Sequence, residues 1–303
     1  MVTMKRIIAL AVFAISFAAC NTSSKDAKTL TIFHAGSLSM PIKAIADSFK
    51  AENPDVRFFL EAAGSVECAR KITELNRKAD IMASADYKII DELLIPSYAD
   101  FNILFAGNEM ALVHTSKSKF ADQISSENWY EILQNPEVHY GRSDPNADPC
   151  GYRTLLTLQL AELYYSKPNL AKSIENKDNR FIRPKEVDLI ALLETGAIDY
   201  IFLYRSVAVQ HSLPYLSLPS EINLGNPKHE EFYKKASVTI RGSSPGDSLI
   251  IVGEPMVYGI TIPKNAPNKE LAQKFLEYYT NKDKGLKIIE SMGMPVIWPL
   301  VKK

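Results

Sequence analysis

Short apolar runs alternate with amphipathic segments along the first hundred residues of the chain. Each apolar run ends in a turn rich in Gly, Ser or Ala, and the segment after the turn has apolar residues at helical spacing. Three such strand–turn–helix units predict a parallel α/β sheet, in which ligands collect outside the carboxyl ends of the strands. The expected strands and helices lie at 30–33 and 40–52, at 56–61 and 66–76, and at 79–84 and 87–94.

The pattern changes after residue 102. Residues 103–113 predict one long strand suited to crossing between two lobes. The later elements expected are helices at 129–133, 154–165, 185–195, 268–279 (capped by Asn268) and 282–291, with strands at 198–204, 237–241 and 256–262. A further helix is expected after Arg205-Ser206, ending at about His211.

These elements predict two α/β lobes with a ligand cleft between them. We expect residues 29–112 and about 251–303 to form lobe 1, and about 113–250 to form lobe 2. Such an architecture suits closure around a small ligand by hinge motion. Many two-domain enzymes share it, so the fold alone does not decide the function.

The N-terminus predicts export. Lys5 and Arg6 precede an apolar run at 7–17 that is too short to span a bilayer and ends just before Cys20. We expect a lipoprotein signal peptide at 1–20, lipid on Cys20, and a polar tether at 21–28. Phe17 stands where such signals usually carry Leu, so a plain secretory signal is the alternative.

The charge and cysteine content limit the kinds of molecule that this protein can bind. Without the signal, the 35 basic residues fall by Lys5 and Arg6 to 33 against 35 acidic residues, a net charge of −2. No basic stripe suggests nucleic acid. If Cys20 is lipidated, Cys68 and Cys150 remain; a disulfide between them is open, but two buried thiols are the favoured interpretation.

An enzyme is hard to build from these residues. The five histidines are not spaced as a zinc pair on a helix, and neither a nucleophile elbow nor a P-loop occurs. His34 near Ser37 fits a packed histidine at a strand end better than a catalytic base. Cys150 lies near a helix start, which lowers thiol pKa values, but the sequence places no base beside it.

Three turns instead suit anion binding. Gly36-Ser37 and Gly64-Ser65 each follow a strand and precede a helix, where hydroxyl and backbone N–H donors gather. Residues 142–153 form a proline-stiffened turn before an apolar helix, with Asp148 placed to cap it. We therefore predict that these turns face one another as a cradle for an oxyanion.

Five motifs stand out, at 34–38, 63–66, 143–153, 183–189 and 204–211. Together they resemble the tungstate/molybdate-binding proteins of the archaeal type, which are solute receptors of ABC importers. The resemblance covers roughly residues 28–300 and implies the type II periplasmic-binding-protein fold. It also implies an exported, periplasm-facing or cell-surface lipoprotein.

The resemblance also implies the site. Asp148 and Glu186 match the two carboxylates that ligate the metal of the oxyanion, and Glu194 is the competitor for Glu186. It implies no cofactor; the partners would be the oxyanion, an ABC permease and its ATPase, and the membrane through the lipid anchor, with the receptor a monomer. The implied ligand contacts are Gly36, Ser37, Ser65, Asp148, Pro149, Cys150, Glu186 and Tyr204.

The presence of two carboxylates in a site for an anion needs a physical explanation. Two unit charges ~4 Å apart repel by about 4 kcal/mol at an effective dielectric constant near 20. Tungsten and molybdenum, unlike sulfur, can accept further hard oxygen ligands and move from tetrahedral toward octahedral geometry. Taken alone, Glu186 would read as a solvated acid at a helix start. The resemblance leaves three alternative functions. They are a receptor for sulfate or phosphate, a two-lobe enzyme acting on an anionic substrate, and a periplasmic sensor subunit.

Overall fold

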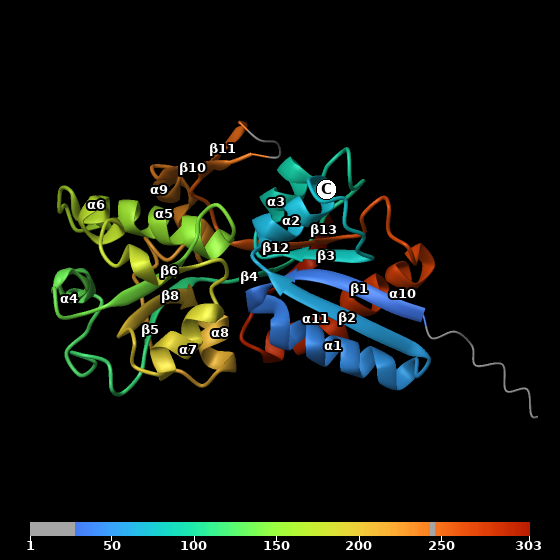
Figure 1. Ribbon diagram of the computed structural model, residues 1–303, viewed down its shortest axis with the longest axis horizontal. Coiled ribbons are helices and arrows are strands. Elements are labelled where there is room, and N and C mark those ends of the chain that lie inside the picture. Colours follow the sequence, from blue (N-terminus) through green and yellow to red (C-terminus); the bar gives the residue numbers. More distant parts are fainter. Residues whose placement is uncertain (1–27, 243–245) are drawn as a thin grey trace, which may run out of the picture.

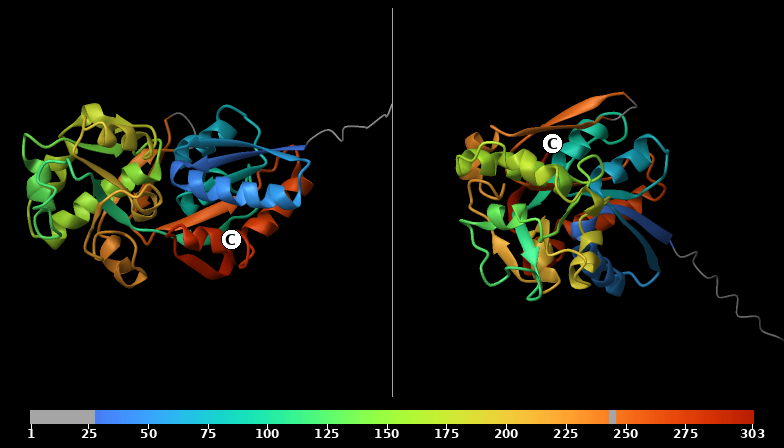
Figure 2. Two further views of the ribbon diagram at one scale, coloured as in Figure 1. Left: turned by 90° about the horizontal axis from the view of Figure 1, so that it is seen from below. Right: turned by 60° about the vertical axis from the view of Figure 1, so that its left-hand side comes forward.

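The computed structural model describes residues 28–242 and 246–303. The expected signal peptide, Cys20 and all of the expected tether except Lys28 lie outside the described residues. The described chain folds into two α/β lobes that lie next to each other (Figures 1 and 2). A search of this part of the chain for a helix long and apolar enough to cross a bilayer finds none.

Lobe 1 is built on a six-stranded sheet in the order β13-β4-β12-β3-β1-β2. Strand β1 pairs in parallel with β2 and with β3, as the three predicted units require. The strands are β1 Lys28–Ala35, β2 Val56–Ala63, β3 Ile81–Ser84, β4 Ile103–Gly107, β12 Val257–Thr261 and β13 Val296–Lys302. The helices are η1 Gly36–Leu38, α1 Ser39–Glu52, α2 Ser65–Thr73, α3 Tyr87–Leu93, α10 Lys269–Tyr279 and α11 Gly285–Ser291.

Lobe 2 is built on a five-stranded sheet in the order β7-β6-β8-β5-β9, with a separate β10-β11 hairpin. Its strands are β5 Met110–His114, β6 Tyr140–Ser143, β7 Ile182–Arg183, β8 Tyr200–Tyr204, β9 Tyr215–Ser217, β10 Ser237–Arg241 and β11 Ser248–Val252. Its helices are α4 Trp129–Gln134, α5 Pro149–Tyr164, α6 Leu170–Glu175, η2 Asn179–Phe181, α7 Asp188–Glu194, α8 Arg205–Gln210, η3 Pro227–His229 and α9 Glu230–Tyr233.

The long strand predicted at 103–113 is two strands in different sheets. Strand β4 pairs with β12 in lobe 1, whereas β5 pairs with β8 in lobe 2. The break falls at Asn108 and Glu109, where Asn108 Oδ1 accepts a hydrogen bond from the Glu109 N–H at 3.0 Å. The segment does cross between lobes, but the first change of sheet lies between Gly107 and Met110. The boundaries expected at 112 and 251 stay a prediction.

Two predicted helix starts are wrong, and one predicted cap is right in position only. Helix α5 begins at Pro149, five residues before the predicted start, because proline is well suited to the first turn. Helix α7 begins at Asp188, so Glu186 lies before the helix. Asn268 occupies the N-cap of α10, but its side chain makes no capping bond and its amide donates to Thr29 O at 3.0 Å.

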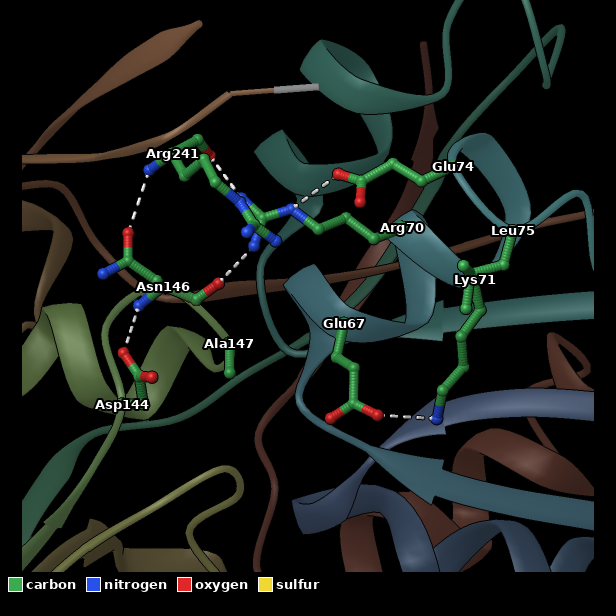
Figure 3. Close-up of a pocket in the computed structure, with 9 residues that line it drawn as sticks. All are labelled: Glu67, Arg70, Lys71, Glu74, Leu75, Asp144, Asn146, Ala147 and Arg241. Carbon is green, nitrogen blue, oxygen red and sulfur yellow. Dashed lines mark hydrogen bonds and ion pairs between the residues drawn. The ribbon is translucent and has the colours of Figure 1, made fainter. Parts of the chain in front are cut away.

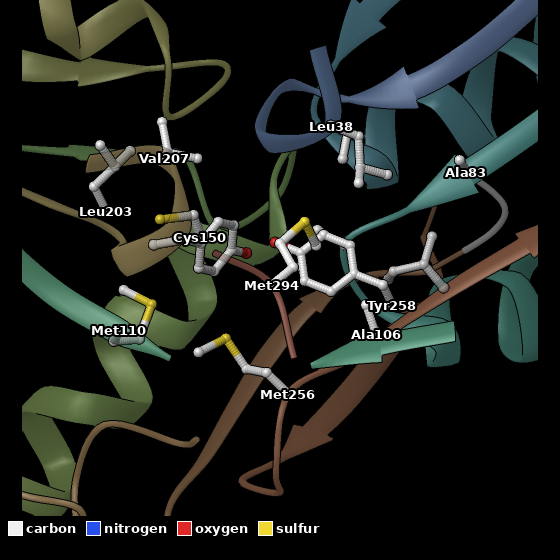
Figure 4. Packing of buried hydrophobic residues seen from close by; sticks show 14 of the residues in the cluster. Leu38, Ala83, Ala106, Met110, Cys150, Leu203, Val207, Met256, Tyr258 and Met294 are labelled. Atoms are coloured by element: carbon white, nitrogen blue, oxygen red, sulfur yellow. The ribbon is translucent and has the colours of Figure 1, made fainter. Parts of the chain in front are cut away.

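The core continues from one lobe into the other. Figure 4 shows Met294 close to the Tyr258 ring, with Met110 and Met256 below Cys150 at the meeting of the lobes. All these side chains are buried. Methionine adapts its shape to irregular gaps, which suits a boundary between two packed bodies. This boundary is where the turns predicted to bind an anion converge.

Candidate functional site

Asp148 is held at the N-terminus of α5 by two backbone donors. Its Oδ1 accepts the Cys150 N–H at 3.2 Å, which is the N-cap bond, and its Oδ2 accepts the Glu186 N–H at 2.8 Å. The side chain is 1% exposed. The Asp148 side chain therefore fixes both the start of α5 and the loop that carries Glu186, with one carboxylate oxygen for each.

Glu186 is a fully buried acid without a hydrogen-bond partner for its carboxylate. Its exposed fraction is 0%, and neither Oε1 nor Oε2 is bonded within residues 28–242 and 246–303. A Cβ built on Gly36 would lie 2.9 Å from Oε2, so the carboxylate faces the η1 turn of lobe 1. Buried polar groups are rarely left unsatisfied, and a carboxylate least of all.

Burial makes ionisation of both carboxyl groups unfavourable. It raises the pKa of Asp148 above its ordinary value, and the hydrogen bonds around Asp148 oppose that rise. Burial first, and the Asp148 charge second, raise the pKa of Glu186 well above its ordinary value. An electropositive centre between the two groups would favour the charged form of both.

The hydroxyls predicted in lobe 1 lie at the same boundary. Ser37 is buried and its Oγ accepts a hydrogen bond from the Tyr258 hydroxyl at 3.1 Å. Ser65 is buried and its Oγ accepts the Ala85 N–H at 2.9 Å. A Cβ on the preceding Gly64 would lie 2.1 Å from Ala147 O, so α2 begins in close contact with the Asp148 turn.

Arg153 joins the lobes around Tyr204. Its Nη1 donates to Tyr204 Oη at 3.1 Å and to Ala85 O at 2.7 Å, and its Nη2 lies 3.2 Å from Asp86 Oδ2. Tyr152, beside it on α5, donates its hydroxyl to the same Asp86 oxygen at 2.6 Å. The ion pair with Asp86 therefore makes Arg153 a brace between the two lobes.

The predicted site residues therefore fall into two groups. Gly36, Ser37, Ser65, Asp148, Glu186 and Tyr204 are buried where the two lobes meet. Pro149 and Cys150 start α5, and the Cys150 thiol is turned away toward Phe202 O at 3.6 Å. Glu194 is exposed at the end of α7, so it does not share the position of Glu186.

The two thiols are separate. Cys68 and Cys150 are both free and buried, which confirms the favoured interpretation over a disulfide. Burial raises the pKa of Cys68 to about 12 and that of Cys150 well above its ordinary value. Neither is an activated thiolate, because activation needs the opposite shift. No cluster of three or more His, Cys, Asp or Glu side chains in the described chain is arranged to hold a metal ion.

A pocket of about 510 Å³ opens beside this site, where α2 meets the turn before α5 (Figure 3). Arg70 reaches across it from lobe 1 to lobe 2, donating to Asn146 O at 2.7 Å and to Arg241 O at 2.6 Å. Glu67 N–H bonds Ala147 O at 3.1 Å in the same place. The pocket is lined by Glu67, Arg70, Lys71, Glu74, Leu75, Asp144, Asn146, Ala147 and Arg241.

Sequence reasoning missed several residues that shape the site. Tyr258 comes from β12, far along the chain from Ser37, and Asp86 caps α3 while also bonding Tyr152. Ser143 ends β6 with its hydroxyl buried and unpartnered among the described residues. Ser143 opens the motif at 143–153, but no local motif marks Tyr258 or Asp86, because their partners lie in distant parts of the chain.

Two α/β lobes closed over a buried polar site are the arrangement of a solute-binding protein. The chain belongs to the bacterial extracellular solute-binding protein family, whose model matches residues 30–295. The predicted fold class is therefore confirmed.

Relatives and solved structures agree with this assignment. A molybdate/tungstate-binding protein WtpA of Pyrococcus abyssi is 44% identical over 307 residues, covering 92% of this chain and 88% of the relative. An uncharacterized solute-binding protein of Petrotoga mobilis is 48% identical, covering 89% and 84%. The molybdate-binding protein of Azotobacter vinelandii superposes with a TM-score of 0.63 at 16% identity, covering 89% and 99%. The sulfate-binding protein SubI of Mycobacterium tuberculosis gives 0.64 at 12%, covering 90% and 88%, so both structures bear on the fold alone.

Proposed function

We propose that this protein captures tungstate or molybdate outside the cytoplasm and presents it to an ABC permease driven by an ATPase. The molybdate/tungstate-binding relatives, at 44% identity across most of the chain, support this ligand class. The solved structures do not discriminate, because molybdate and sulfate binders superpose about equally well.

One observation carries the choice of ligand. Glu186 is buried with both carboxylate oxygens unpartnered, and it lies close enough to Asp148 for each to shift the other's pKa. A sulfate site would gain nothing from two carboxylates, because sulfur takes no further oxygen ligands. Tungsten or molybdenum would take one oxygen from each acid and reach octahedral coordination.

The remaining contacts would hold the oxo groups. In this proposal the Ser37, Ser65 and Tyr204 hydroxyls donate to the oxo groups, together with backbone N–H groups at Gly36 and at the start of α5. Pro149 shapes that start, and Cys150 contributes its N–H rather than its thiol. The carboxylates thus select the element, and the hydroxyl and N–H donors match the negative charge of the oxo groups.

The sequence and the family support a cellular setting for this receptor. We propose export directed by the signal peptide at 1–20, lipid on Cys20, and a monomer tethered at the periplasmic or outer face of the membrane. Strand β1 begins at the end of lobe 1 that points away from lobe 2 (Figure 1), so a tether would leave both lobes unobstructed. The protein would act as a receptor and not as an enzyme.

Isothermal titration of residues 21–303 with tungstate, molybdate and sulfate tests the function. We expect one-to-one binding of the first two and no heat from sulfate. Sulfate bound as tightly would mean a general oxyanion cradle in which the carboxylates are misassigned. No heat from any of the three would favour the alternative of a two-lobe enzyme acting on an anionic substrate.

A further inference from the structure

A buried chain of hydrogen-bonded side chains runs from the crossing between the lobes to Ser37. It starts at Ser206 in α8, passes through Asn108 between β4 and β5 and through Tyr258 in β12, and ends at Ser37. All four residues are at most 4% exposed. A buried network of this kind fixes the direction of each hydrogen bond in it.

The direction is set at Asn108. Its Oδ1 accepts the Glu109 N–H at 3.0 Å and faces the Ser206 N–H at 3.4 Å, and a backbone N–H can only donate. The amide nitrogen must therefore face the other way. There Nδ2 donates to Ser206 Oγ at 2.7 Å and to Tyr258 Oη at 3.0 Å.

The direction is then passed on to Ser37. Tyr258 Oη accepts from Asn108 and donates its own proton to Ser37 Oγ at 3.1 Å, its remaining partner among the described residues. Ser37 Oγ is thus an acceptor in this bond, and its own proton is free for another partner. No other hydrogen bond of Ser37 Oγ occurs within the two described stretches of chain.

The same polarity occurs at the other two hydroxyls of the proposed cradle. Ser65 Oγ accepts the Ala85 N–H at 2.9 Å, and Tyr204 Oη accepts from Arg153 Nη1 at 3.1 Å. Neither donor can reverse its role, since a backbone N–H and a guanidinium carry no acceptor. Each hydroxyl is left with a proton to donate, which is what the oxo groups of an anion require.

We propose that Tyr258 is a positioning residue that commits the Ser37 hydroxyl to donate to the bound oxyanion and ties it to the crossing between the lobes at Asn108. The inference rests on the proposed function, because Ser37 is a ligand contact only there. Tyr258 itself does not touch the ligand. It acts by orienting the Ser37 proton and by joining that contact to the segment that crosses between the lobes.

The test is tungstate titration of Tyr258→Phe, with Tyr279→Phe as the matched control. Tyr279 is also fully buried, also packs edge-on against Phe105, and its hydroxyl has no partner in the described part of the chain. Both variants remove one hydroxyl and keep the ring, so their thermal unfolding midpoints check that both fold. We expect Tyr258→Phe to weaken binding about five- to tenfold and Tyr279→Phe to change it less than about twofold.

A double-mutant cycle with Ser37→Ala separates positioning from packing. If Tyr258 acts through Ser37, then Tyr258→Phe costs little further affinity once Ser37 is alanine. Equal losses in both backgrounds, or unchanged affinity of Tyr258→Phe in wild type, would overturn the inference while leaving the proposed function standing. Failure of the wild-type protein to bind tungstate would instead reject the proposed function.

Discussion

The main-chain N–H of Glu186 donates to Asp148 Oδ2 at 2.8 Å, so these two acids are joined through the backbone of one and the side chain of the other. The Glu186 carboxylate faces the Gly36 turn of the opposite lobe. Asp148 thus supports the loop of Glu186 as well as its own helix, and the two acids should respond differently to substitution.

Glu186→Gln should weaken tungstate binding by about 2–3 kcal/mol, the scale of losing a charge-assisted contact. Sulfate should gain relative to tungstate, because a negative charge leaves the site while metal coordination is lost. The protein should fold normally, since a neutral amide is easier to bury than a carboxylate. Titration with both anions measures this, and an unchanged tungstate affinity would contradict the six-coordinate site.

Asp148→Ala should weaken binding and also lower stability by about 1 kcal/mol, because it removes the cap of α5. Asp148→Asn is the matched variant, since asparagine caps helices well but carries no charge. We expect Asp148→Asn to lose tungstate affinity with little change in urea unfolding. Equal stability losses in the two variants would show that the charge, and not the cap, supports the fold.

Gly64→Ala should hold the lobes apart. The added Cβ would lie 2.1 Å from Ala147 O in the closed protein, yet the backbone at Gly64 has φ −61°, which alanine adopts freely. The open protein should therefore be as stable as wild type, while tungstate affinity falls by about 1–3 kcal/mol. Gly107→Ala is the control, because its Cβ meets nothing nearer than 3.4 Å. Titration measures the tungstate affinity, and small-angle scattering measures whether the lobes are closed. A Gly64→Ala variant that is closed and binds tungstate tightly would contradict the expectation.

Arg153→Gln should speed release of the ligand. It leaves Asp86 buried between the closed lobes without its cation, and truncating one partner of such a pair costs about 2–5 kcal/mol. In the open form Asp86 can be solvated, so the unpaired charge destabilises only the closed form. The ligand is released when the lobes open, so the dissociation rate should rise. Lys43→Gln breaks an exposed pair with Asp47 and should change neither rate. Stopped-flow displacement compares the two.

Glu61 should contribute an acid-sensitive part of the stability. Its hydrogen bonds from Arg77, foremost, and from Lys71 hold the pKa of Glu61 below its ordinary value. Because the folded pKa is depressed, this stabilisation is present above the unfolded pKa of about 4.5 and is lost as pH falls through the folded value. Urea midpoints measured from pH 7 to 3 should fall less steeply in Glu61→Gln. Parallel curves would show that the ion pair is energetically neutral.

The sequence predicted elements whose signal is local. Strands β1, β2 and β8 and helices α1 to α3 have clear periodicity and turn residues, and the structure has them within a few residues of the expected bounds. Strands β6, β7, β9, β11 and β13 were missed. Strands β7 and β9 have only two and three residues, and the periodicity of such short segments carries little information.

The site divides in the same way. Asp148 was predictable as a cap, and the Gly-Ser turns at 36–37 and 64–65 were predictable from their place after strands. The burial of Glu186 was not, because alone it reads as a solvated acid at a helix start, and only the resemblance to a family singled it out. Tyr258 and Asp86 carry no local signal, since their partners lie in distant parts of the chain.

The two crossings between the lobes leave from neighbouring points. Gly107, the last residue before the first crossing, is paired with Val257, the first strand residue after the second. Lobe 2 is therefore a single insertion with adjacent ends, and it carries Asp148, Glu186 and Tyr204 together. Recombination at these two joints would exchange the acids proposed to choose the element while retaining the Gly-Ser turns of lobe 1. On that proposal, a change of cargo needs the transfer of only one contiguous stretch of gene.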